Sequence, residues 1–586
     1  MHDPEVLNFL TIPVPVVRRS GPGLATPAEI TAGHADDPVV GVRLGHPLAD
    51  RGFEFLMRDL LQAALAPADA AAWRRMLFDP PEPGDLAERL APYHPAFGLT
   101  HPAHPAMQVR PDPQRLAQAA ARAPSRSRRP APGDDDDDGD GGEAGTLPIA
   151  ALLPDLPTGE AVKQDADFFV RRGGVEAIGA AAILPVLYAH MVLFPPGGGG
   201  YLGLPHGADS IKFQLLGGTL WQTLWLNVLC REAEGGGDAR WPAPVDEGTF
   251  PWLDPTLAVM PLGRNEDGAA RPVGRGGLHP AHIPMPRRYL LAPPVPGRCA
   301  LTGVEGPVFT AYSRWPKGLQ YQPQGWWHPA VSRIEDTAKP DDPPRFVRAR
   351  GPLRFDDWLE TALLREGAPP SGKAQVKRRL FPPVLRQFAS QRDTLASPRP
   401  DGAATAVMEE GIFRVRAFAQ FSFGKAPGGM SQRELPVWLS PEPGDTAWLA
   451  MEVTEVAGLV NDLAGNLFVS ARAACTLGRR DVTAALPDTL KDALLAEMDA
   501  AVLDLPGRLA AIIRDHATDA ARFAAADGHR RRLLTLGRNA ALRLFDDAFP
   551  IDGTGPSDGR LAAERAALVR RLHDTLSFGL TAQGAS

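Results

Sequence analysis

The feature that most constrains the fold is the spacing of apolar residues in the last quarter of the chain. From about Asp445, apolar side chains recur every three or four residues in four segments, which glycine and proline residues separate. One helical turn takes 3.6 residues, so this spacing places the apolar side chains on one face of a helix. The segments carry, in order, Leu449, Val453, Val456, Val460, Leu463 and Leu467; Leu490, Leu494, Met498 and Val502; Leu509 to Phe545, with a break expected near Gly528; and Leu561, Leu568, Leu572 and Leu576. The pattern predicts a four-helix bundle over residues 441–586.

The preceding 440 residues show a mixed pattern. With 586 residues the chain is too long for one hydrophobic core, which favours several domains. Residues 7–17 are β-branched and interrupted by prolines, so they predict an edge strand or a hairpin arm. Residues 51–77 have helical spacing, and residues 411–423 alternate as a strand does. The expected class is α+β, with a large mixed α/β domain over 1–440 followed by the bundle.

Composition excludes several classes of protein. No apolar run approaches the ~20 residues that a membrane span needs, so no membrane association is expected. The three cysteines share no local motif, and the start of the chain lacks the pattern of a signal peptide; both favour a reducing, cytoplasmic setting. The net charge of −7 argues against a uniformly basic surface but leaves room for a local basic groove.

Residues 110–146 differ in character from their surroundings. Arginines precede an acidic run, Asp134–Asp138, and glycines follow it. Such charge-segregated sequence buries too little apolar surface to offset the entropy of ordering, so a disordered insert is expected. A nucleic-acid mimic and a calcium loop are weaker interpretations, and the run lacks the glycine turn and the bidentate glutamate of calcium loops.

Two stretches have the composition of ligand-binding segments. Gly197–Gly200 are four consecutive glycines, which let a backbone approach a ligand that any Cβ would block, although a flexible turn is the commoner meaning of such a run. Phe168–Arg172 combines aromatic rings with paired arginines, a combination that can stack on bases and hold phosphates.

Two further stretches predict hairpins with basic side chains. Residues 299–329 alternate as a small hairpin would and carry Tyr312, Arg314, Lys317 and Tyr321, which form either a nucleic-acid surface or a small core. The strand at 411–423 carries Arg414 and Arg416, expected to point outward and hold phosphates. It leads into a sequence, GKAPGGMSQRE, that predicts a tight glycine turn.

Motifs of catalysis and metal binding are missing from the sequence. There is no phosphate-binding P-loop, HExxH, GxSxG or paired CxxC motif. Thr302 stands where a zinc hairpin beginning at Cys299 would need its second cysteine. Prolines after His101 and His104 prevent the helix that would align these two side chains. We therefore expect no catalytic residue, no metal and no cofactor.

Taken in order, several stretches resemble the large subunit of type I-E CRISPR Cascade, the CasA or Cse1 family. They are LNFLTIPVPVVRR near the start, LTHPAHPAMQ at 99–108, DFFVRR at 167–172, GGGGYLGLPHG at 197–207, LLGGTLWQTLWLNVL at 215–229, GRGGLHPAHIPM at 274–285, GLQYQPQGWWHPAVS at 318–332 and the terminal helical region. The resemblance implies a non-catalytic DNA-recognition subunit. Such a subunit recognises the protospacer-adjacent motif (PAM) in double-stranded DNA, promotes duplex opening and R-loop formation, and recruits the helicase-nuclease. The implied partners are the guide RNA (crRNA), target DNA, the helicase-nuclease, and the backbone, small, guide-handle and endoribonuclease subunits of Cascade.

The resemblance also implies roles for individual residues. The glycine loop at the minor groove of the motif corresponds to Gly197, Gly198, Gly199 and Gly200. The wedge hairpin corresponds to Gly429, Met430, Ser431 and Gln432, and the basic finger to Arg314 or Lys317. The contact with the guide-RNA handle or a neighbouring subunit corresponds to Phe169, Val170 and Arg171. The zinc-binding cysteines of some members are absent here, and the insert at 110–146 has no known counterpart.

Two alternatives belong to other classes of protein. A stand-alone enzyme could use the Gly197–Gly200 loop for a phosphorylated small ligand, but no helix start with Lys-Ser/Thr follows the loop. A scaffold that binds only protein is the second alternative. Neighbouring genes for a Cascade backbone subunit and a CRISPR array would favour the DNA-recognition subunit over both.

Overall fold

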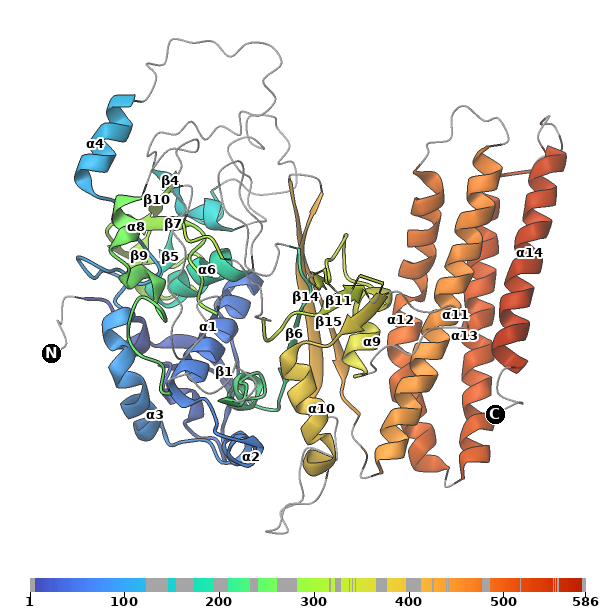
Figure 1. Cartoon of the computed structure of the whole chain (residues 1–586), viewed down its shortest axis with the longest axis horizontal. Coiled ribbons are helices and arrows are strands. Elements are labelled where there is room, and N and C mark those ends of the chain that lie inside the picture. Colours follow the sequence, from blue (N-terminus) through green and yellow to red (C-terminus); the bar gives the residue numbers. More distant parts are fainter. Residues whose placement is uncertain are drawn as a thin grey trace.

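The structure, a computed structural model, describes most of the chain. The described residues are 6–122, 146–153, 173–193, 209–231, 241–260, 282–315, 318–321, 328–336, 338–339, 341–342, 344–364, 377–396, 413–423, 426–438, 440, 442–476, 485–516, 518–551, 553, 555 and 558–581. Helices and small sheets mix in the first three quarters, and long helices follow them (Figure 1). This arrangement confirms the expected α+β class.

The chain begins with a small antiparallel sheet. Strands β1 (Val14–Arg18), β2 (Gly21–Ala25) and β3 (Val39–Val42) are ordered β2-β1-β3. The hairpin arm expected at 7–17 is therefore present as β1, but it is the central strand of the sheet rather than an edge. The side chains of Val14 and Val16 are buried beneath it, as the alternation along a strand requires.

The helix expected over 51–77 is two helices, α1 (Pro47–Leu65) and α2 (Ala70–Phe78). Pro67 follows the end of α1, and Asp69 caps α2 by accepting a hydrogen bond from the backbone N–H of Ala72 at 2.7 Å. The apolar spacing continues across this break, which is why the sequence pattern joined the two helices. Helix α3 (Pro83–Leu90) follows.

Two buried helices form the centre of the N-terminal part. α1 packs against α6 (Ala180–Val192), and nearly every residue of both is buried. The crossing is close at Gly52, where an added Cβ would lie 2.0 Å from the carbonyl oxygen of Pro185. Glycine at this position lets the two helix backbones touch.

Two more small sheets lie beside these helices within the described residues, and a third lies toward the long C-terminal helices (Figure 1). Their strands are β5 (Ile178–Gly179), β9 (Glu305–Phe309) and β8 (Val295–Arg298) in the first; β4 (Leu147–Pro148), β10 (Ala311–Trp315) and β7 (Arg288–Leu291) in the second; and β12 (Arg345–Phe346), β11 (Arg333–Asp336) and β13 (Lys377–Leu380) in the third, each in this spatial order. The single hairpin expected over 299–329 is wrong, because β9 and β10 follow one another but pair in different sheets.

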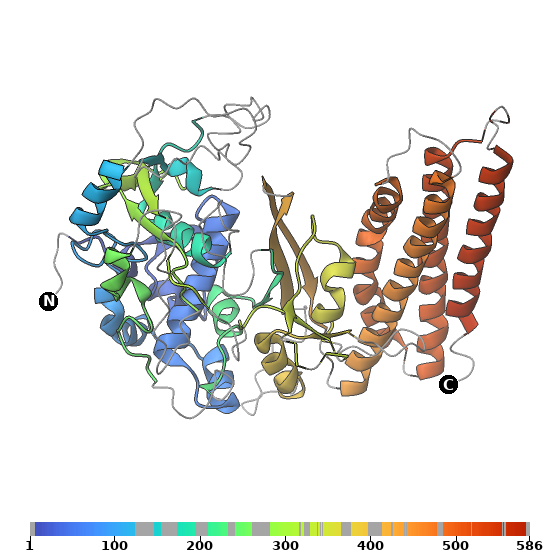
Figure 2. The same cartoon turned by 45° about the horizontal axis from the view of Figure 1, so that its top comes forward.

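A further sheet stands between the N-terminal part and the long helices (Figures 1 and 2). Its strands are β6 (Lys212–Leu216), β14 (Arg414–Phe423) and β15 (Ala426–Pro436), ordered β15-β14-β6. The strand expected at 411–423 is confirmed as β14.

Shorter elements complete the part of the chain that precedes the long helices. They are α7 (Leu220–Trp225), α8 (Thr256–Val259), α9 (Phe355–Ala362), α10 (Pro383–Ala396) and the 3-10 turns Phe9–Thr11, Glu29–Thr31, Ala91–Ala96, Ile149–Leu152 and Pro251–Leu253.

The expected bundle is present as α11 (Pro443–Cys475), α12 (Leu486–Asp515), α13 (Asp519–Ala548) and α14 (Asp558–Thr581), which lie side by side in Figures 1 and 2. Two details differ from the expectation. Leu509 belongs to α12, which continues through Pro506, and α13 runs through Gly528 without a break. Inside the bundle, Arg530 of α13 pairs with Glu452 of α11 at 2.6 Å, both nearly fully buried.

The expected disordered insert is in part a helix. Residues Pro113–Arg122 form α4, although they lie inside the range 110–146. Asp112 stands just before α4 and accepts hydrogen bonds from the backbone N–H groups of Gln114 and Arg115, as a helix-capping aspartate does. The acidic run Asp134–Asp138 lies outside the described residues.

Candidate nucleic-acid interface

Several of the predicted site residues lie outside the described residues. These are Gly197–Gly200 of the glycine loop, Phe169, Val170 and Arg171 of the guide-handle contact, and Lys317 of the basic finger. The described candidates are Arg314 and the four wedge residues. The described residues that flank the glycine loop, Leu193 and Asp209, show where the chain enters and leaves that segment.

The β14–β15 hairpin corrects the sequence interpretation of the wedge. Most of the segment expected to be a tight glycine turn is strand: β15 begins at Ala426, so Gly429, Met430, Ser431 and Gln432 all lie within it. The first two residues of the expected turn, between the end of β14 at Phe423 and the start of β15, lie outside the described residues. The register pairs Gln432 with Phe418 and Met430 with Gln420. The glycines accommodate an irregularity within the strand. The register shifts between Phe421 and Ser422, and Gly429 opposite has a φ of 121°.

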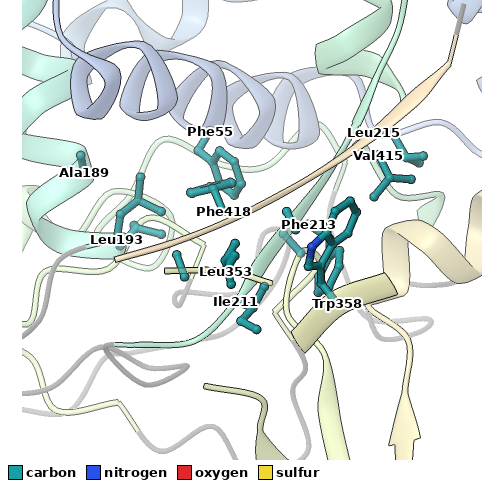
Figure 3. Close-up of a cluster of buried hydrophobic side chains, with 14 of the residues drawn as sticks. Phe55, Ala189, Leu193, Ile211, Phe213, Leu215, Leu353, Trp358, Val415 and Phe418 are labelled. Atoms are coloured by element: carbon teal, nitrogen blue, oxygen red, sulfur yellow. The ribbon is translucent and has the colours of Figure 1, made fainter. Parts of the chain in front are cut away.

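Alternation along the strands gives the hairpin two faces. Arg416, Phe418, Gln420, Gln432 and Glu434 share one face, which lies against α1 and is called the lobe face below. Phe418 packs there on Phe55 of α1, with ring centroids 5.3 Å apart (Figure 3). The opposite face, called the bundle face, carries Ser431 and Arg433 and lies toward α9 and α12.

The two arginines of β14 do not both point into solvent. The Arg416 side chain is only 12% exposed and contacts Glu434 at 2.8 Å and Glu54 of α1 at 3.0 Å. Its guanidinium also donates to Gln214 Oε1. Burial raises the pKa of Glu54. The expectation that Arg416 holds a phosphate is therefore wrong for this structure, because two carboxylates already neutralise it, whereas Arg414 is half exposed.

Gln432 is the exposed polar side chain of the wedge segment. Its Nε2 donates to Glu434 Oε1 at 3.3 Å, a long hydrogen bond to a neighbour two residues away on the same strand. Ser431 points the other way, where its Oγ accepts a hydrogen bond from the backbone N–H of Leu353 at 2.9 Å. The four wedge residues therefore divide between the two faces of the hairpin.

Arg314 has a different setting from the one expected for a finger. It lies in the interior of β10, paired with Tyr289 of β7, and is partly buried. Its charge contributes to lowering the pKa of His190, after burial of the imidazole and the charge of Arg287. Arg314 thus belongs to a sheet of the N-terminal part rather than to the tip of a hairpin.

The flanks of the glycine loop meet the hairpin. Leu193, the C-terminal cap of α6, belongs to the same buried cluster as Phe418 (Figure 3). Lys212, which begins β6, pairs with Phe418 in the sheet. The end of α6 and the start of β6 therefore lie beside the middle of β14, while Asp209, where the described chain resumes, accepts a hydrogen bond from the backbone N–H of Ala349 at 2.8 Å.

Lys212 is a functional candidate that the sequence analysis missed. Its side chain is fully buried, and burial lowers its pKa to about 7, while the charge of Asp209 acts in the opposite direction. A lysine in an otherwise apolar strand, IKFQLL, was the available signal. This pattern predicts a lysine within a strand, but it does not predict how deeply the side chain is buried.

The bundle face connects the hairpin to the long helices. Asp499 of α12 accepts a hydrogen bond from the backbone N–H of Phe355, the first residue of α9, at 2.7 Å, and pairs with Arg433 of β15 at 3.3 Å. Arg354 pairs with Asp492 of α12 at 2.9 Å. The strand that carries Gln432 is thus held to the bundle one residue further along, at Arg433.

The described residues hold neither a metal cluster nor a membrane span. No group of three or more His, Cys, Asp or Glu side chains suited to a metal ion occurs among them. In the turn after Cys299, the backbone N–H of Thr302 hydrogen-bonds to Cys299 Sγ at 3.4 Å, so the protein closes this turn without a second cysteine. Within the described part of the chain, no helix is long and apolar enough to cross a membrane.

Comparison with known proteins identifies what this architecture is similar to. The family model described as CRISPR-associated protein Cse1 matches residues 8–543. Among solved structures, the chain is similar to CasA from Thermus thermophilus, with 18% identity, coverage of 98% of this chain and 100% of that chain, and a TM-score of 0.56. It is also similar to Cse1 from Acidimicrobium ferrooxidans (15% identity, 99% of both chains, TM-score 0.59) and to Thermobifida fusca Cse1 (14% identity, 98% and 99%, TM-score 0.55). No curated protein matches the chain.

Proposed function

Because the chain belongs to the CRISPR-associated Cse1 family, the large subunit of type I-E Cascade, we propose that it recognises the PAM in double-stranded target DNA. In this proposal it promotes duplex opening and R-loop formation and then recruits the helicase-nuclease. It performs no catalysis itself. Its partners are the crRNA, the target DNA, the helicase-nuclease and the other Cascade subunits. Residues 1–440 carry DNA recognition, and residues 441–586 form a separate bundle.

The observation that supports the proposal most directly is the meeting of two candidate elements. Leu193, the last described residue before the glycine loop, belongs to the same buried cluster as Phe418. Lys212, three residues after Asp209, pairs with Phe418, and Gln432 is directly opposite Phe418 in the hairpin. In this proposal one DNA duplex contacts both the glycine loop and the hairpin. The minor groove presents few groups that distinguish one base pair from another. A protein that binds there therefore recognises the groove through its backbone, small hydrogen-bond donors and the shape of the groove. Glycines suit that role because they bring the backbone close.

The side chain of Gln432 suits the opening step. It is exposed, and its amide is held only by the long hydrogen bond to Glu434 among the described residues. An amide has both donor and acceptor groups, so it can replace part of the hydrogen bonding of a disrupted base pair. Unstacking a base step costs a few kcal/mol, which contacts with the separated strands offset. Guide pairing then supplies sequence specificity, while the protein reads only the short motif.

The remaining roles follow the family resemblance. We assign Phe169, Val170 and Arg171 to the guide-RNA handle or a neighbouring subunit, and Arg314 or Lys317 to a basic contact with DNA. The partly buried position of Arg314 in β10 favours Lys317 for the exposed contact, because a phosphate contact requires an accessible charge. Charge reversal at Lys317 in the assembled complex should therefore weaken DNA binding more than Arg314→Gln does.

The test of the proposal compares two variants on two targets. In the assembled complex, Gln432→Ala and Gly199→Asp should each weaken binding to intact duplex that carries the motif by about tenfold or more, ~1.4 kcal/mol. On a target whose strands are already separated beside the motif, Gln432→Ala should recover most of its affinity, because the cost of unpairing is gone. Binding by Gly199→Asp should stay weak, because the aspartate side chain still clashes with the minor groove and its charge is still repelled by the phosphates. Affinities are measured by gel shift at one salt concentration, since phosphate contacts make affinity salt-dependent.

A matched control uses another exposed glutamine. Gln114 lies in α4, and Gln114→Ala should bind both targets as the parent does. If the parent complex shows no preference for duplex with a motif, the recognition function is wrong. If the parent binds but Gln432→Ala keeps parent affinity on intact duplex, the wedge assignment is wrong and the recognition function remains.

A further inference from the structure

One buried side chain of the hairpin lacks hydrogen bonds. Gln420 in β14 is only 3% exposed, and within the described part of the chain neither its Nε2 nor its Oε1 has a hydrogen-bond partner. Buried polar atoms in folded proteins nearly always have a partner, and an exception calls for a physical explanation. A primary amide with both ends unpaired carries the full cost of its desolvation.

Other buried glutamines of the chain show the usual pattern. Gln62 donates to the carbonyl of Leu229 at 2.9 Å and accepts from the N–H of the same residue at 2.7 Å. Gln108 donates to the carbonyl of Leu99 and accepts from the N–H of Leu291. Gln420 is therefore an exception among side chains of the same type in the same protein.

The position of Gln420 is also distinctive. The register of β6 with β14 covers Arg414–Phe418, so Gln420 lies beyond the end of β6, in the part of the hairpin that extends past it (Figure 1). It is opposite Met430 and diagonal to Gln432, on the lobe face. The register irregularity at Phe421 follows immediately, and bulges of this kind re-aim side chains next to functional sites.

We propose that Gln420 is a second DNA-contacting residue of the hairpin, whose amide hydrogen-bonds to the edge of a nucleobase once the duplex is open. This inference rests on the proposed DNA-recognition function. A base edge presents neighbouring donor and acceptor groups, which match the two ends of a primary amide. Met430, opposite Gln420 on this face and only partly buried, provides an apolar surface against which an unstacked base can pack.

The energetic consequence is a bias toward the DNA-bound state. In the free protein the Gln420 amide is desolvated and has no hydrogen-bond partner among the described residues, and the bound base relieves that cost. A ligand shifts a conformational equilibrium only when it binds the two states with different affinities. A base that pairs with an otherwise unsatisfied amide creates such a difference. Replacing the amide by an apolar group of similar shape should therefore leave the free protein equally or more stable while weakening DNA binding.

The experiment measures both quantities for Gln420→Met, with Gln420→Leu as a second apolar variant. We expect the melting temperature of the isolated chain to stay equal or rise. In the assembled complex, binding to intact motif-bearing duplex should weaken by about tenfold, ~1.4 kcal/mol. On the target with pre-separated strands the loss should persist, since the missing contact is to an exposed base; Gln432→Ala, in contrast, should recover there.

Gln62→Met is the matched control. It removes a satisfied buried amide far from the hairpin in sequence, so it should lower the melting temperature and leave the affinity of the folded complex unchanged. If Gln420→Met and Gln420→Leu lower the melting temperature and keep parent affinity, the amide binds an ordered water only and the inference is overturned, while DNA recognition stands. If the parent complex fails to bind motif-bearing duplex, the proposed function and this inference fail together.

Discussion

The C-terminal bundle and the N-terminal part of the chain are held together in different ways. In the bundle, exposed ion pairs such as Arg508 with Asp504 and Arg531 with Asp527 join residues one turn apart, and the buried pair of Arg530 with Glu452 joins two helices of the bundle itself. In the N-terminal part, buried polar groups find partners far away in sequence: His282 contacts Asp59 across 223 residues. Arg416 of the central sheet contacts Glu54 across 362 residues.

This difference has an energetic meaning. Exposed ion pairs on helix surfaces contribute little to the free energy of unfolding, because water and salt screen them. Buried charged groups are costly to leave without a partner, so removing one member of such a group should destabilise the protein strongly. The bundle should therefore tolerate changes to its charged surface, whereas the N-terminal part depends on long-range contacts that form only in the complete fold.

The largest expected effect concerns fragments. We expect residues 441–586 expressed alone to be soluble and helical by circular dichroism, because their apolar spacing and pairing are internal to the bundle. A fragment that ends at Met260 should lack a cooperative melt, because it loses His282 and Arg416. A soluble bundle fragment without helical minima would contradict the proposal that this region is an independent domain.

The second prediction concerns the buried cluster at Asp59. This carboxylate accepts from His282 Nδ1 at 2.8 Å and from the hydroxyl of Tyr188, and it pairs with Arg58 at 2.6 Å. Asp59→Ala should lower the free energy of unfolding by about 3–5 kcal/mol, because the partners stay buried without their acceptor. Urea denaturation measures the loss. The control Asp504→Ala, at an exposed pair, should change stability by about 0–1 kcal/mol. Equal effects at the two sites would remove the proposed contrast between the two regions.

The third prediction concerns the junction between the two regions at Asp499. Burial raises the pKa of this carboxyl, although Phe355 N–H and Arg433 act against the shift. Asp499→Ala should destabilise by about 1–3 kcal/mol, because it leaves the N–H of Phe355 without its acceptor. Asp499→Asn keeps an oxygen for that N–H and removes the buried charge, so it should lie within about 1 kcal/mol of the parent. Thermal melts compare the three proteins. If Asn proves as damaging as Ala, the ion pair with Arg433 and not the hydrogen bond carries the junction.

The last prediction is a pH dependence of stability at His190. Burial, followed by the charge of Arg287, lowers its pKa to about 3, from the ordinary 6.5. Between these values the unfolded chain binds a proton that the folded chain excludes. The free energy of unfolding therefore falls as the pH drops from 6.5 toward 3, by at most about 1.4 kcal/mol per pH unit. Above pH 6.5 this contribution is complete and constant.

His190→Gln tests this dependence, since glutamine has no titrating group. The variant should be less stable than the parent at pH 7.5, because it alters the hydrogen bonds to Leu152 and Tyr289. The difference in stability between parent and variant should narrow on acidification to pH 5.5 and then 4.5. A difference that stays constant over this range would show that His190 does not titrate with folding.

The sequence predicted the parts of the fold that depend on local pattern. The apolar spacing of α11 and the alternation of β14 are properties of neighbouring residues, so they were recognisable without the rest of the chain. The errors have the same origin. The glycines of GKAPGGMSQRE predicted a turn, but Gly428 and Gly429 lie in β15, where pairing with β14 overrides the local preference of Gly429. β9 and β10 lie in two different sheets because they pair with β5 and β7, and no local sequence pattern predicts these pairings.

The candidate site divides in the same way. The family resemblance predicted Gln432 and the glycine loop as site residues, because short motifs can be recognised directly in the sequence. The neutralisation of Arg416, the burial of Lys212 and the unpaired amide of Gln420 were not predictable. Each depends on what packs against the side chain, and that environment comes from residues distant in the chain.

By itself, then, the sequence determined the class of the fold, the four C-terminal helices and the family, because these depend on periodicity and on ordered motifs. The tertiary structure decided which face of the β14–β15 hairpin each side chain joins and how the hairpin contacts both the N-terminal part and α12. The physical reason is register. A shift of one residue along a strand moves every side chain to the opposite face, and only the packing of both faces against distant elements selects one register.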